Sequence, residues 1–499
     1  MSTTTSSHKM SKENSFTAQA QHGSNHGLKK DTLGVMDIVF YIIAAASPLT
    51  GVIAIAPIML SMGNGVGSPS AFLVAMAILV LFSVGYLAMS RHVKNAGALY
   101  SYVTLGLGRP VGLGAAALTI FAYTAIQVGL YGGFGFYAAE LLSSSFGLDV
   151  PWWVLASTAA VLCLFLGLHG VHSGAVVLGV LLTLEVILVV VLNGGILLNS
   201  PTPASEFSFE PFTPSALFSP GLGIALMFAC ACFIGFEGSA IYSEEARNPR
   251  KTIPRATYIS VLFMGALYSL TMWLITNALG VDQAVAISQR EGGNLIFWVS
   301  NLVLNPWLTN CFNIFIVTAI FAALVTFHNN IARYLYILGR QGLVWSALSY
   351  TRSEKQTPYV ASLVQTVSVV AIVAPFVVLQ LDPYTTLFAW MTGIGSVAII
   401  LAQVVAAVAI FVFFRKSNVD KRLWHTLVAP AIATAGLGVF LYYALTSIDV
   451  LMGLTGAVAN WMVAAIFMIF ALGIGYGYYI KMKSPSRYEA LTKALTYDN

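Results

Sequence analysis

Long apolar segments, separated by short polar ones, fill the chain from residue 35 to residue 480. A helix needs about 20 residues to cross a bilayer, and each of these segments is close to that length or longer. Glycine, proline and asparagine between the segments mark where helices stop. The pattern predicts twelve membrane-spanning helices. Their ranges are 35–61, 70–90, 112–142, 152–169, 174–199, 219–242, 257–279, 306–338, 358–381, 384–414, 426–446 and 458–480.

The composition agrees with this pattern. Hydrophobic residues make up 58% of the chain, charged residues only 9%, and the mean hydropathy is +0.81. Soluble domains carry about 25% charged residues, so we interpret the chain as an all-α integral membrane protein. The four cysteines all fall in predicted spans, where they behave as small apolar residues, and we expect no disulfide and no metal site from them.

Basic residues fall in alternate connections between the predicted helices, for example 247–255 and 415–422. Of the 24 lysines and arginines, only Arg290 lies in a connection of the other set. Because short loops with Lys and Arg stay on the cytoplasmic side, we predict a multi-pass cell-membrane protein with both termini in the cytoplasm. The net charge of +5 then follows from this topology and does not indicate a nucleic-acid surface.

The two ends of the chain are predicted to be cytoplasmic tails. Residues 1–30 are Ser, Thr, Gln, His and Lys without an apolar core, so they are neither a signal peptide nor an anchor, and we expect them to be disordered. The second tail is expected at 481–499.

The first predicted helix contains a break at residues 46–51. Pro48 removes an amide donor and disfavours the α conformation at Ser47, so the helix must unwind or kink there. We expect Ser47 to cap the second half of the helix, whose first amides would present partial positive charge to an anion. The alternative is an ordinary proline kink. The amides concerned belong to Leu49, Thr50 and Gly51.

A second break, Phe233-Ile-Gly-Phe-Glu237, interrupts the helix predicted at 219–242. In hydrocarbon every backbone N–H and C=O needs a partner, so a helix broken at Gly235 and Gly238 is tolerated only where it lines a cavity or packs against protein. The carboxyl of Glu237 inside a membrane indicates a translocation site. The alternative is that Glu237 only caps the second half of the helix and holds the break open.

The two breaks lie five helices apart, at corresponding positions of two five-helix units. An odd number of helices per unit makes the units inverted, and paired interruptions in inverted halves are typical of the midplane binding site of secondary transporters. We therefore predict a first repeat at 31–199, an extracellular loop at 200–218, a second repeat at 219–414, and two additional helices within 415–480.

Three motifs carry a resemblance to a known family. The most specific is the run from Phe233 to Glu237 that continues into Glu244-Glu-Ala-Arg-Asn-Pro-Arg-Lys-Thr-Ile-Pro-Arg255, and the others are 95–102 and 332–342. On these motifs, residues 33–445 resemble the amino acid–polyamine–organocation superfamily, amino acid permease type. The resemblance implies a LeuT-like inverted-repeat fold with helices 1 and 6 discontinuous, and import or exchange of amino acids or related amines.

The resemblance also implies site residues. In similar permeases the unwound part of helix 1 holds the substrate carboxylate with backbone amides, which corresponds here to residues 47–51, and carbonyls of helix 6 take the amine. The position of Glu237 is often acidic in the family and is implicated in proton-dependent gating. The chain departs from the family in lacking the glycine-rich helix 1 signature and in having Ala231 at the usual aromatic gate. The helix 6 carbonyls correspond to Phe233, Ile234 and Gly235.

Glu185 is a second acid in the middle of a predicted helix. A charge at mid-bilayer costs about 2.5–3.5 kcal/mol on insertion scales, so this carboxyl must face the bundle, find a partner or be protonated. In some similar permeases a helix 5 lysine replaces a sodium ion, and Glu185 corresponds to that position, which makes it our second candidate for proton coupling. The alternative is a neutral acid that bonds a carbonyl of a neighbouring helix and has no role in coupling.

Polar side chains also follow one face of the third predicted helix. Tyr123, Gln127 and Tyr131 are spaced four residues apart, which puts them on the same side. We favour a role for Gln127 and Tyr131 in lining the substrate pocket, and the alternative is hydrogen bonding between helices.

The motifs of enzymes do not occur in the right context, so we expect neither an enzyme nor a bound cofactor. The leading hypothesis is a secondary active transporter for an amino acid or related amine, driven by protons or by exchange. No Lys or Arg is predicted at the midplane, which favours zwitterionic or cationic substrates. The alternatives are a polyamine or organic-amine importer of the same fold, a membrane sensor that transports little, and a channel, which would need a continuous polar stripe or charged ring.

Overall fold

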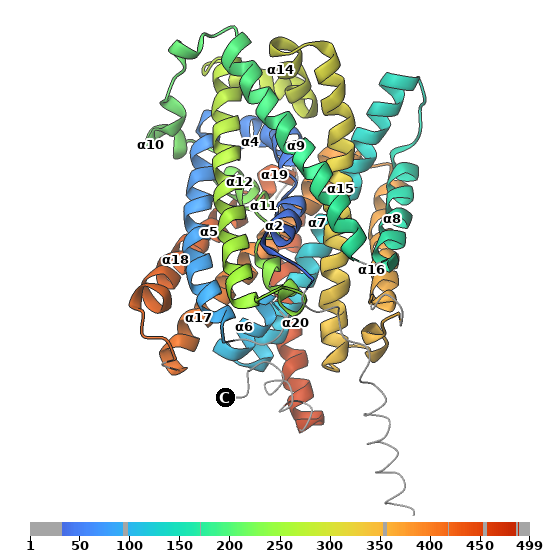
Figure 1. Ribbon diagram of the computed structural model, residues 1–499, viewed down its shortest axis with the longest axis vertical. Coiled ribbons are helices and arrows are strands. Elements are labelled where there is room, and N and C mark those ends of the chain that lie inside the picture. Colours follow the sequence, from blue (N-terminus) through green and yellow to red (C-terminus); the bar gives the residue numbers. More distant parts are fainter. Residues whose placement is uncertain are drawn as a thin grey trace, which may run out of the picture.

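The computed structural model describes residues 32–92, 98–169, 171–352, 357–417, 419–452 and 457–485, and Tyr488. The predicted tail at 1–30 and most of the predicted tail at 481–499 lie outside these residues. The described part is a helical bundle whose longest helices run roughly along one axis (Figure 1). Its only β-type pairing is a parallel bridge between Leu33 and Ala246.

Eleven of the described helices are long and apolar enough to cross a membrane. They agree with eleven of the predicted spans to within a few residues at most ends. The spans are α2 to α4 (Val35–Ser61), α5 (Ser68–Ser90), α7 (Arg109–Phe146), α8 (Trp152–His169), α9 (Val171–Asn199), α12 (Pro249–Leu279), α15 (Pro306–Arg340), α16 (Tyr359–Val378), α17 (Ala389–Ser417), α18 (Ala429–Thr446) and α20 (Ala457–Lys483). Single π-helical turns precede α17 (Pro383–Phe388) and α18 (Trp424–Val428).

The span predicted at 219–242 has a different form. Its first part is the ten-residue helix α11 (Leu222–Ala231), and its last part is the 3-10 helix η5 (Glu237–Glu244). Between them, Gly235 has φ of +114°, which an α-helix does not allow and which favours glycine. This backbone conformation explains why no continuous helix forms here.

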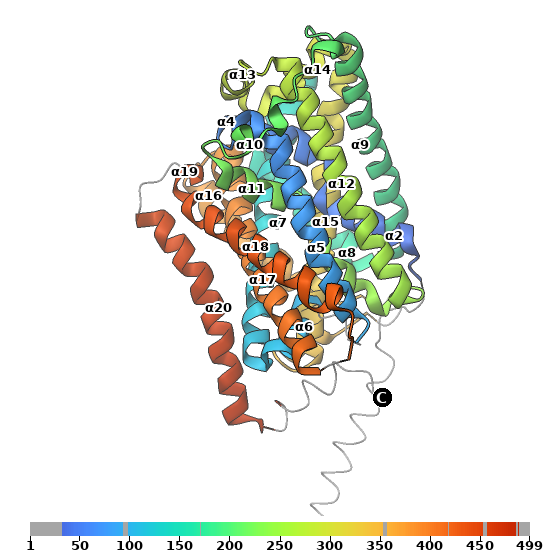
Figure 2. The ribbon, with the colours of Figure 1, turned by 90° about the vertical axis from the view of Figure 1, so that its left-hand side faces the viewer.

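Several short helices were not predicted. They are α6 (Ala98–Leu107), α10 (Pro214–Leu217), α13 (Ala284–Glu291), α14 (Leu295–Val303) and α19 (Ile448–Met452). Figures 1 and 2 show α6 at the lower end of the bundle and α10, α13 and α14 at the upper end. They cover the ends of the spans, and their positions depend on contacts with those spans rather than on a long periodic pattern of their own.

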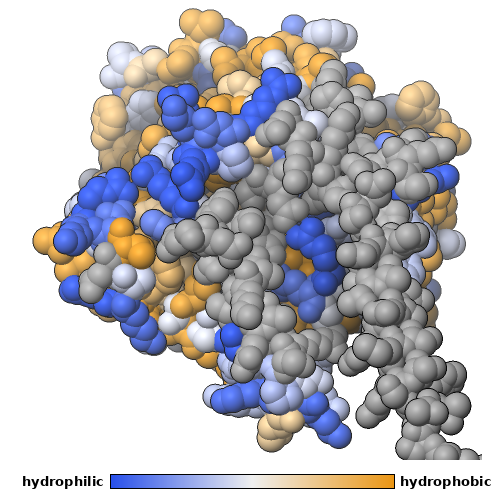
Figure 3. All heavy atoms as spheres, turned by 60° about the horizontal axis from the view of Figure 1, so that its bottom comes forward, coloured by the Kyte–Doolittle hydropathy of each residue, from blue (hydrophilic) through white to orange (hydrophobic). Residues whose placement is uncertain are grey.

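The surface of the bundle is divided by polarity. Figure 3, which views the lower end, shows hydrophilic residues gathered on that face and mostly hydrophobic residues around the sides. Basic residues follow the ends of several spans, including Arg340 at the end of α15 and Lys481 and Lys483 at the end of α20. Apolar sides between polar ends are what a bilayer requires of a multi-pass protein.

The helices differ in how much of each is covered by protein. The first span, Val35–Ser61, lies at the centre, and 94% of its most apolar stretch of 18 residues is buried inside the protein. It packs against α12, α9 and α15. At the other extreme, α8, α16 and α20 lie on the outside. In their most apolar stretches of 18 residues, 28%, 22% and 17% are buried. The first break is therefore enclosed by the rest of the bundle.

Candidate functional site

The first break begins at Ser47. Helix α2 (Val35–Ala46) ends before Ser47, which has a left-handed conformation with φ of 47°, and α3 (Pro48–Thr50) begins directly after it. The expected side-chain cap at Ser47 is not formed. Its hydroxyl instead lies 2.6 Å from the hydroxyl of Thr50. A π-helical turn, Gly51–Ile55, follows before α4 (Ala56–Ser61), so the helix stays distorted beyond the proline.

Two of the three amides proposed for anion binding already lie beside acceptors of the protein. The amide of Gly51 donates to the carbonyl of Ser47 at 3.0 Å, which continues the helical pattern across the break. The amide of Leu49 lies beside the carboxyl of Glu185 on α9. The partial positive charge of this half-helix is therefore directed at an acid of the protein itself.

The second break is a run of tight turns between α11 and η5. The amide of Phe233 donates to the carbonyl of Cys230 at 3.0 Å, and that of Ile234 donates to Ala231 at 3.1 Å. The carbonyl of Gly235 accepts from the amide of Gly238 at 3.0 Å. A carbonyl oxygen has two lone pairs, so these bonds leave acceptor capacity in the break.

The second break lies against the end of α2, next to the first break. A side chain at Gly235 would put its Cβ 2.6 Å from the Cβ of Ala45 and 3.5 Å from the carbonyl oxygen of Ile42. Ala45 lies two residues before Ser47, so the second break packs on the turn of helix that leads into the first. The positive φ and the contact with Ala45 both require glycine at position 235.

Tyr268 of α12 contacts both breaks, and the sequence analysis did not single it out. Its hydroxyl donates to the carbonyl of Ala46 at 3.3 Å, and its ring covers the face of Gly51, where an added Cβ would lie 2.5 Å away. The ring of Phe233 meets it edge-on with centroids 6.3 Å apart. A tyrosine in the middle of a span needs a hydrogen-bond partner, and this requirement could have marked Tyr268 as a candidate site residue from the sequence.

Glu237 lies where η5 begins and is fully buried. Its carboxyl accepts a hydrogen bond from the hydroxyl of Tyr123 at 2.8 Å and from the amide of Gly235 at 3.3 Å. The hydroxyl of Tyr86 donates to its backbone carbonyl at 2.6 Å. The carboxyl therefore does bond within the break, as the capping alternative requires, and it also connects the break to α7.

Glu185 is buried beside the first break, with 1% of its surface exposed. The carboxyl lies beside the amide of Leu49, and its Oε2 has no hydrogen-bond partner. Burying a carboxyl oxygen that has no partner costs free energy, unless the oxygen carries a proton or contacts a cation. Whether Glu185 couples transport to protons or is a neutral structural acid stays a prediction.

Gln127 and Tyr131 of α7 make their described contacts away from the breaks. The amide of Gln365 on α16 donates to Gln127 Oε1 at 2.5 Å, and Gln127 in turn donates to the carbonyl of Leu324 at 3.4 Å. The hydroxyl of Tyr131 lies within hydrogen-bonding reach of Gln127 and Cys163. Among the three polar residues predicted on one face of this helix, Tyr123 contacts the second break through Glu237.

A buried ion pair lies between the second break and the lower end of the bundle. Arg333 of α15 binds Glu245 with Nε to Oε1 at 3.1 Å, and the two side chains are only 4% and 6% exposed. The Arg333 guanidinium lies 5.1 Å above the ring of Tyr242, which stacks on Tyr41 of α2 at 4.9 Å. These contacts tie α2, η5 and α15 together below the breaks.

The backbone completes this closure. The amides of Thr32 and Leu33 donate to the carbonyl of Glu245 at 2.9 and 3.0 Å, and the amide of Arg247 donates to Leu33 at 2.8 Å. The segment before the first helix is thereby fixed to the loop after η5. In the described residues no group of three or more His, Cys, Asp or Glu side chains is suitable for a metal ion.

Comparisons with known proteins identify the family of the chain. The family model described as amino acid permease matches residues 33–474. The branched-chain amino acid permease BcaP of Bacillus subtilis is 24% identical over 326 residues, which cover 60% of this chain and 65% of BcaP. BcaP of Lactococcus lactis is 26% identical over 351 residues, covering 66% of this chain and 73% of the relative.

A relative with a different named substrate is also similar. The low-affinity putrescine importer PlaP of Escherichia coli K12 is 20% identical over 294 residues, which cover 58% of this chain and 63% of PlaP. For PlaP and for the Bacillus relative, the match spans a little under two thirds of the relative's length.

Proposed function

Because the chain belongs to the amino acid permease family, we propose that it is a secondary active transporter that moves an amino acid or a related amine across the cell membrane. The observation that carries the proposal is the direct contact between two broken helices, Gly235 against Ala45, inside the bundle. Broken helices expose peptide groups to a substrate at mid-membrane, and rocking of the surrounding helices gives access from one side at a time.

The proposed architecture is the inverted repeat, with units at 31–199 and 219–414 and two further helices. The breaks support it, because they fall in the first and sixth predicted spans, and Gly235 of the second contacts Ala45, two residues before Ser47. The basic residues at the ends of α15, α17 and α20 support a cytoplasmic location for the lower end and for both termini.

We propose that substrate binds where the two breaks meet, at Ser47, Leu49, Thr50 and Gly51 of the first and Phe233, Ile234 and Gly235 of the second. Every one of these residues is buried in the structure. The contacts of Tyr268 with both breaks support this closed arrangement, and substrate would have to displace its ring from Gly51. A lining role for Gln127 and Tyr131 remains a prediction.

The two buried acids are proposed to couple transport to protons. Glu237 is bonded to Tyr123 and to the break itself, so loss or gain of its proton would change the contacts that connect η5 to α7. The carboxyl of Glu185 lies beside the amide of Leu49, which belongs to the proposed substrate site. Its Oε2 has no hydrogen-bond partner. A proton on either acid would therefore change the break that it contacts.

These acids also bear on the class of substrate. A carboxylate-bearing substrate would compete with Glu185 for the Leu49 amide, whereas an amine would be attracted by both carboxyls. An amino acid is proposed first because two relatives are named as branched-chain amino acid permeases, and a diamine second because a third is named as a putrescine importer.

Binding to the purified protein tests the proposal. We expect L-leucine or putrescine to raise the melting temperature, because a ligand that binds only the folded state stabilises it. D-leucine at the same concentration serves as a matched control for L-leucine. Failure of every amino acid and amine in such a screen to shift the melting temperature would contradict the proposed substrate class.

A further inference from the structure

A groove runs along the outside of the bundle between α7, α8 and α16, which is not the region of the two breaks. It encloses about 220 Å³. Trp153 and Ala160 of α8, Val369 and Val378 of α16, and Tyr131 of α7 are among the side chains that line it. We refer to it as the α8–α16 groove.

The walls of the α8–α16 groove are apolar. Alanine and valine make up most of the lining, and its two hydroxyl groups belong to Ser157 and Tyr131. The Ser157 hydroxyl donates to the carbonyl of Trp153 at 2.7 Å, and the Tyr131 hydroxyl contacts Gln127 and Cys163. A polar ligand would therefore lose its hydrogen bonds with water on entering and gain few in return.

The groove faces the bilayer. Helices α8 and α16 are among the least buried spans, and groove residues such as Trp153 and Val370 are 45% and 51% exposed. In a protein that spans a membrane, side chains exposed at this depth meet hydrocarbon. The available occupant is therefore a lipid chain.

The groove has a mouth and a floor. Trp153 lies at the start of α8, at the level where tryptophan side chains anchor spans to the bilayer surface. At the other end, the lining residues Tyr131 and Val369 each lie one helical turn after a glutamine. These glutamines, Gln127 and Gln365, are hydrogen bonded to each other at 2.5 Å. This buried glutamine pair lies one helical turn beyond the lining residues Tyr131 and Val369, and an apolar chain would not extend past such a polar contact.

We propose that the α8–α16 groove binds one acyl chain of a bilayer phospholipid, which enters beside Trp153 and ends next to Tyr131. The chain would lie along α8 and α16 and fill space that neither helix fills alone. Through Tyr131 it would contact the hydrogen-bonded set that joins α7 to α16. This inference does not depend on which substrate is transported.

Photolabelling tests the inference directly. The full-length protein is reconstituted in phosphatidylcholine vesicles that contain a phosphatidylcholine with a diazirine near the middle of one acyl chain. After illumination, peptides are mapped by mass spectrometry. We expect the label to concentrate on groove residues such as Ser157 and Val373 relative to the exposed face of α20.

Two alanine variants form a matched pair. Ala374 is exposed and lines the groove, whereas Ala464 is exposed on α20 and does not. Ala374→Phe should lose the groove label and Ala464→Phe should keep it, with Val370→Trp as a second groove-filling variant in case Ala374→Phe does not fold. Even labelling of α8, α16 and α20, or an unchanged groove label in the folded filling variants, would overturn the inference. Neither outcome depends on transport activity.

Discussion

Gly235 is the residue on which the contact between the two broken helices depends. Its φ of +114° is one that other residues rarely adopt, and its missing side chain is what allows Ala45 to approach. Gly235→Ala should lower the free energy of unfolding by about 1–3 kcal/mol through backbone strain, with further cost from the clash with Ala45. Denaturation of the purified protein in detergent measures this.

A second glycine provides the control. Gly438 lies inside α18, and nothing lies within 4 Å of the position of an added Cβ. Gly438→Ala should be neutral or should stabilise by up to about 1 kcal/mol, because alanine favours a helix interior over glycine. Equal effects of the two substitutions would show that the second break is not under the strain described.

Glu237 is expected to link uptake to pH. In Glu237→Gln the carboxamide keeps an acceptor for Tyr123 but cannot exchange a proton, so uptake into vesicles should lose its dependence on an imposed pH gradient. Tyr123→Phe, which removes the hydrogen bond and keeps the acid, should change the rate and retain the dependence. A Glu237→Gln variant with the wild-type pH profile would leave Glu237 as a structural cap only.

Glu185 allows charge and hydrogen bonding to be separated. Glu185→Gln keeps a polar group beside the Leu49 amide, whereas Glu185→Leu removes it, and an unsatisfied buried amide costs about 1–3 kcal/mol. We expect Glu185→Gln to fold with near-native stability and to transport with an altered pH profile. A purely structural role predicts native transport in Glu185→Gln and loss of stability in Glu185→Leu alone.

At the scale of helices, the lower end of the bundle is closed by α2, η5 and α15 through the Arg333–Glu245 pair. Removing one partner of a buried pair costs about 3–5 kcal/mol, so Glu245→Gln should destabilise this closed arrangement. A cysteine introduced at Thr326 of α15, in a background without native cysteines, should then react faster with a maleimide added from the cytoplasmic side.

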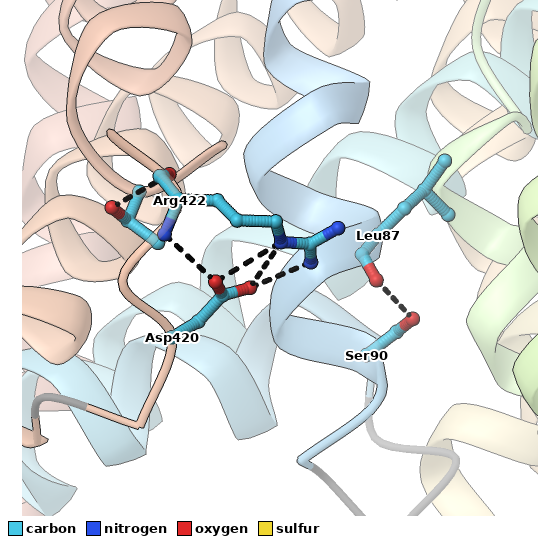
Figure 4. Close-up of polar contacts among 5 residues, drawn as sticks. Leu87, Ser90, Asp420 and Arg422 are labelled. Atoms are coloured by element: carbon cyan, nitrogen blue, oxygen red, sulfur yellow. Dashed lines mark hydrogen bonds and ion pairs between the residues drawn. The ribbon is translucent and has the colours of Figure 1, made fainter. Parts of the chain in front are cut away.

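An exposed ion pair at the connection between α17 and α18 is the matched control (Figure 4). Arg422 binds Asp420 at 2.6 Å, but its side chain is 47% exposed. Hydrogen bonds from Arg422 lower the pKa of Asp420 to about 2, so the pair persists at neutral pH. Asp420→Asn should change stability by about 0–1 kcal/mol and leave the cysteine at position 326 unreactive. Equal labelling in the two variants would argue against a closing role for Arg333–Glu245.

The sequence was sufficient to predict most spans, because a span depends on the apolar pattern of its own residues. It was also sufficient for both breaks, since Pro48 and Gly235 act on the local backbone. The short helices α6, α13 and α14 could not be predicted, because contacts with the spans position them. The contacts Glu185–Leu49 and Tyr123–Glu237 likewise join residues more than 100 positions apart, and local patterns carry no information on such pairs.

At the scale of the molecule, the structure is closed around both breaks. The Arg333–Glu245 pair closes the lower end, and Tyr384 binds the carbonyl of Ala54 above the first break at 2.9 Å. Alternating access requires these contacts to open in turn. For the whole protein we therefore propose that substrate bound at the two breaks is carried across the membrane.

Counterflow in vesicles that contain the purified protein tests this claim most directly. Vesicles loaded with unlabelled L-leucine or putrescine are diluted into a trace of the same compound in radioactive form, without any ion gradient. We predict transient accumulation of label by the wild type, and its loss in Gly235→Ala but not in Gly438→Ala. Binding of either compound without accumulation would contradict transport and favour a sensor, and full accumulation by folded Gly235→Ala would contradict a site at the two breaks.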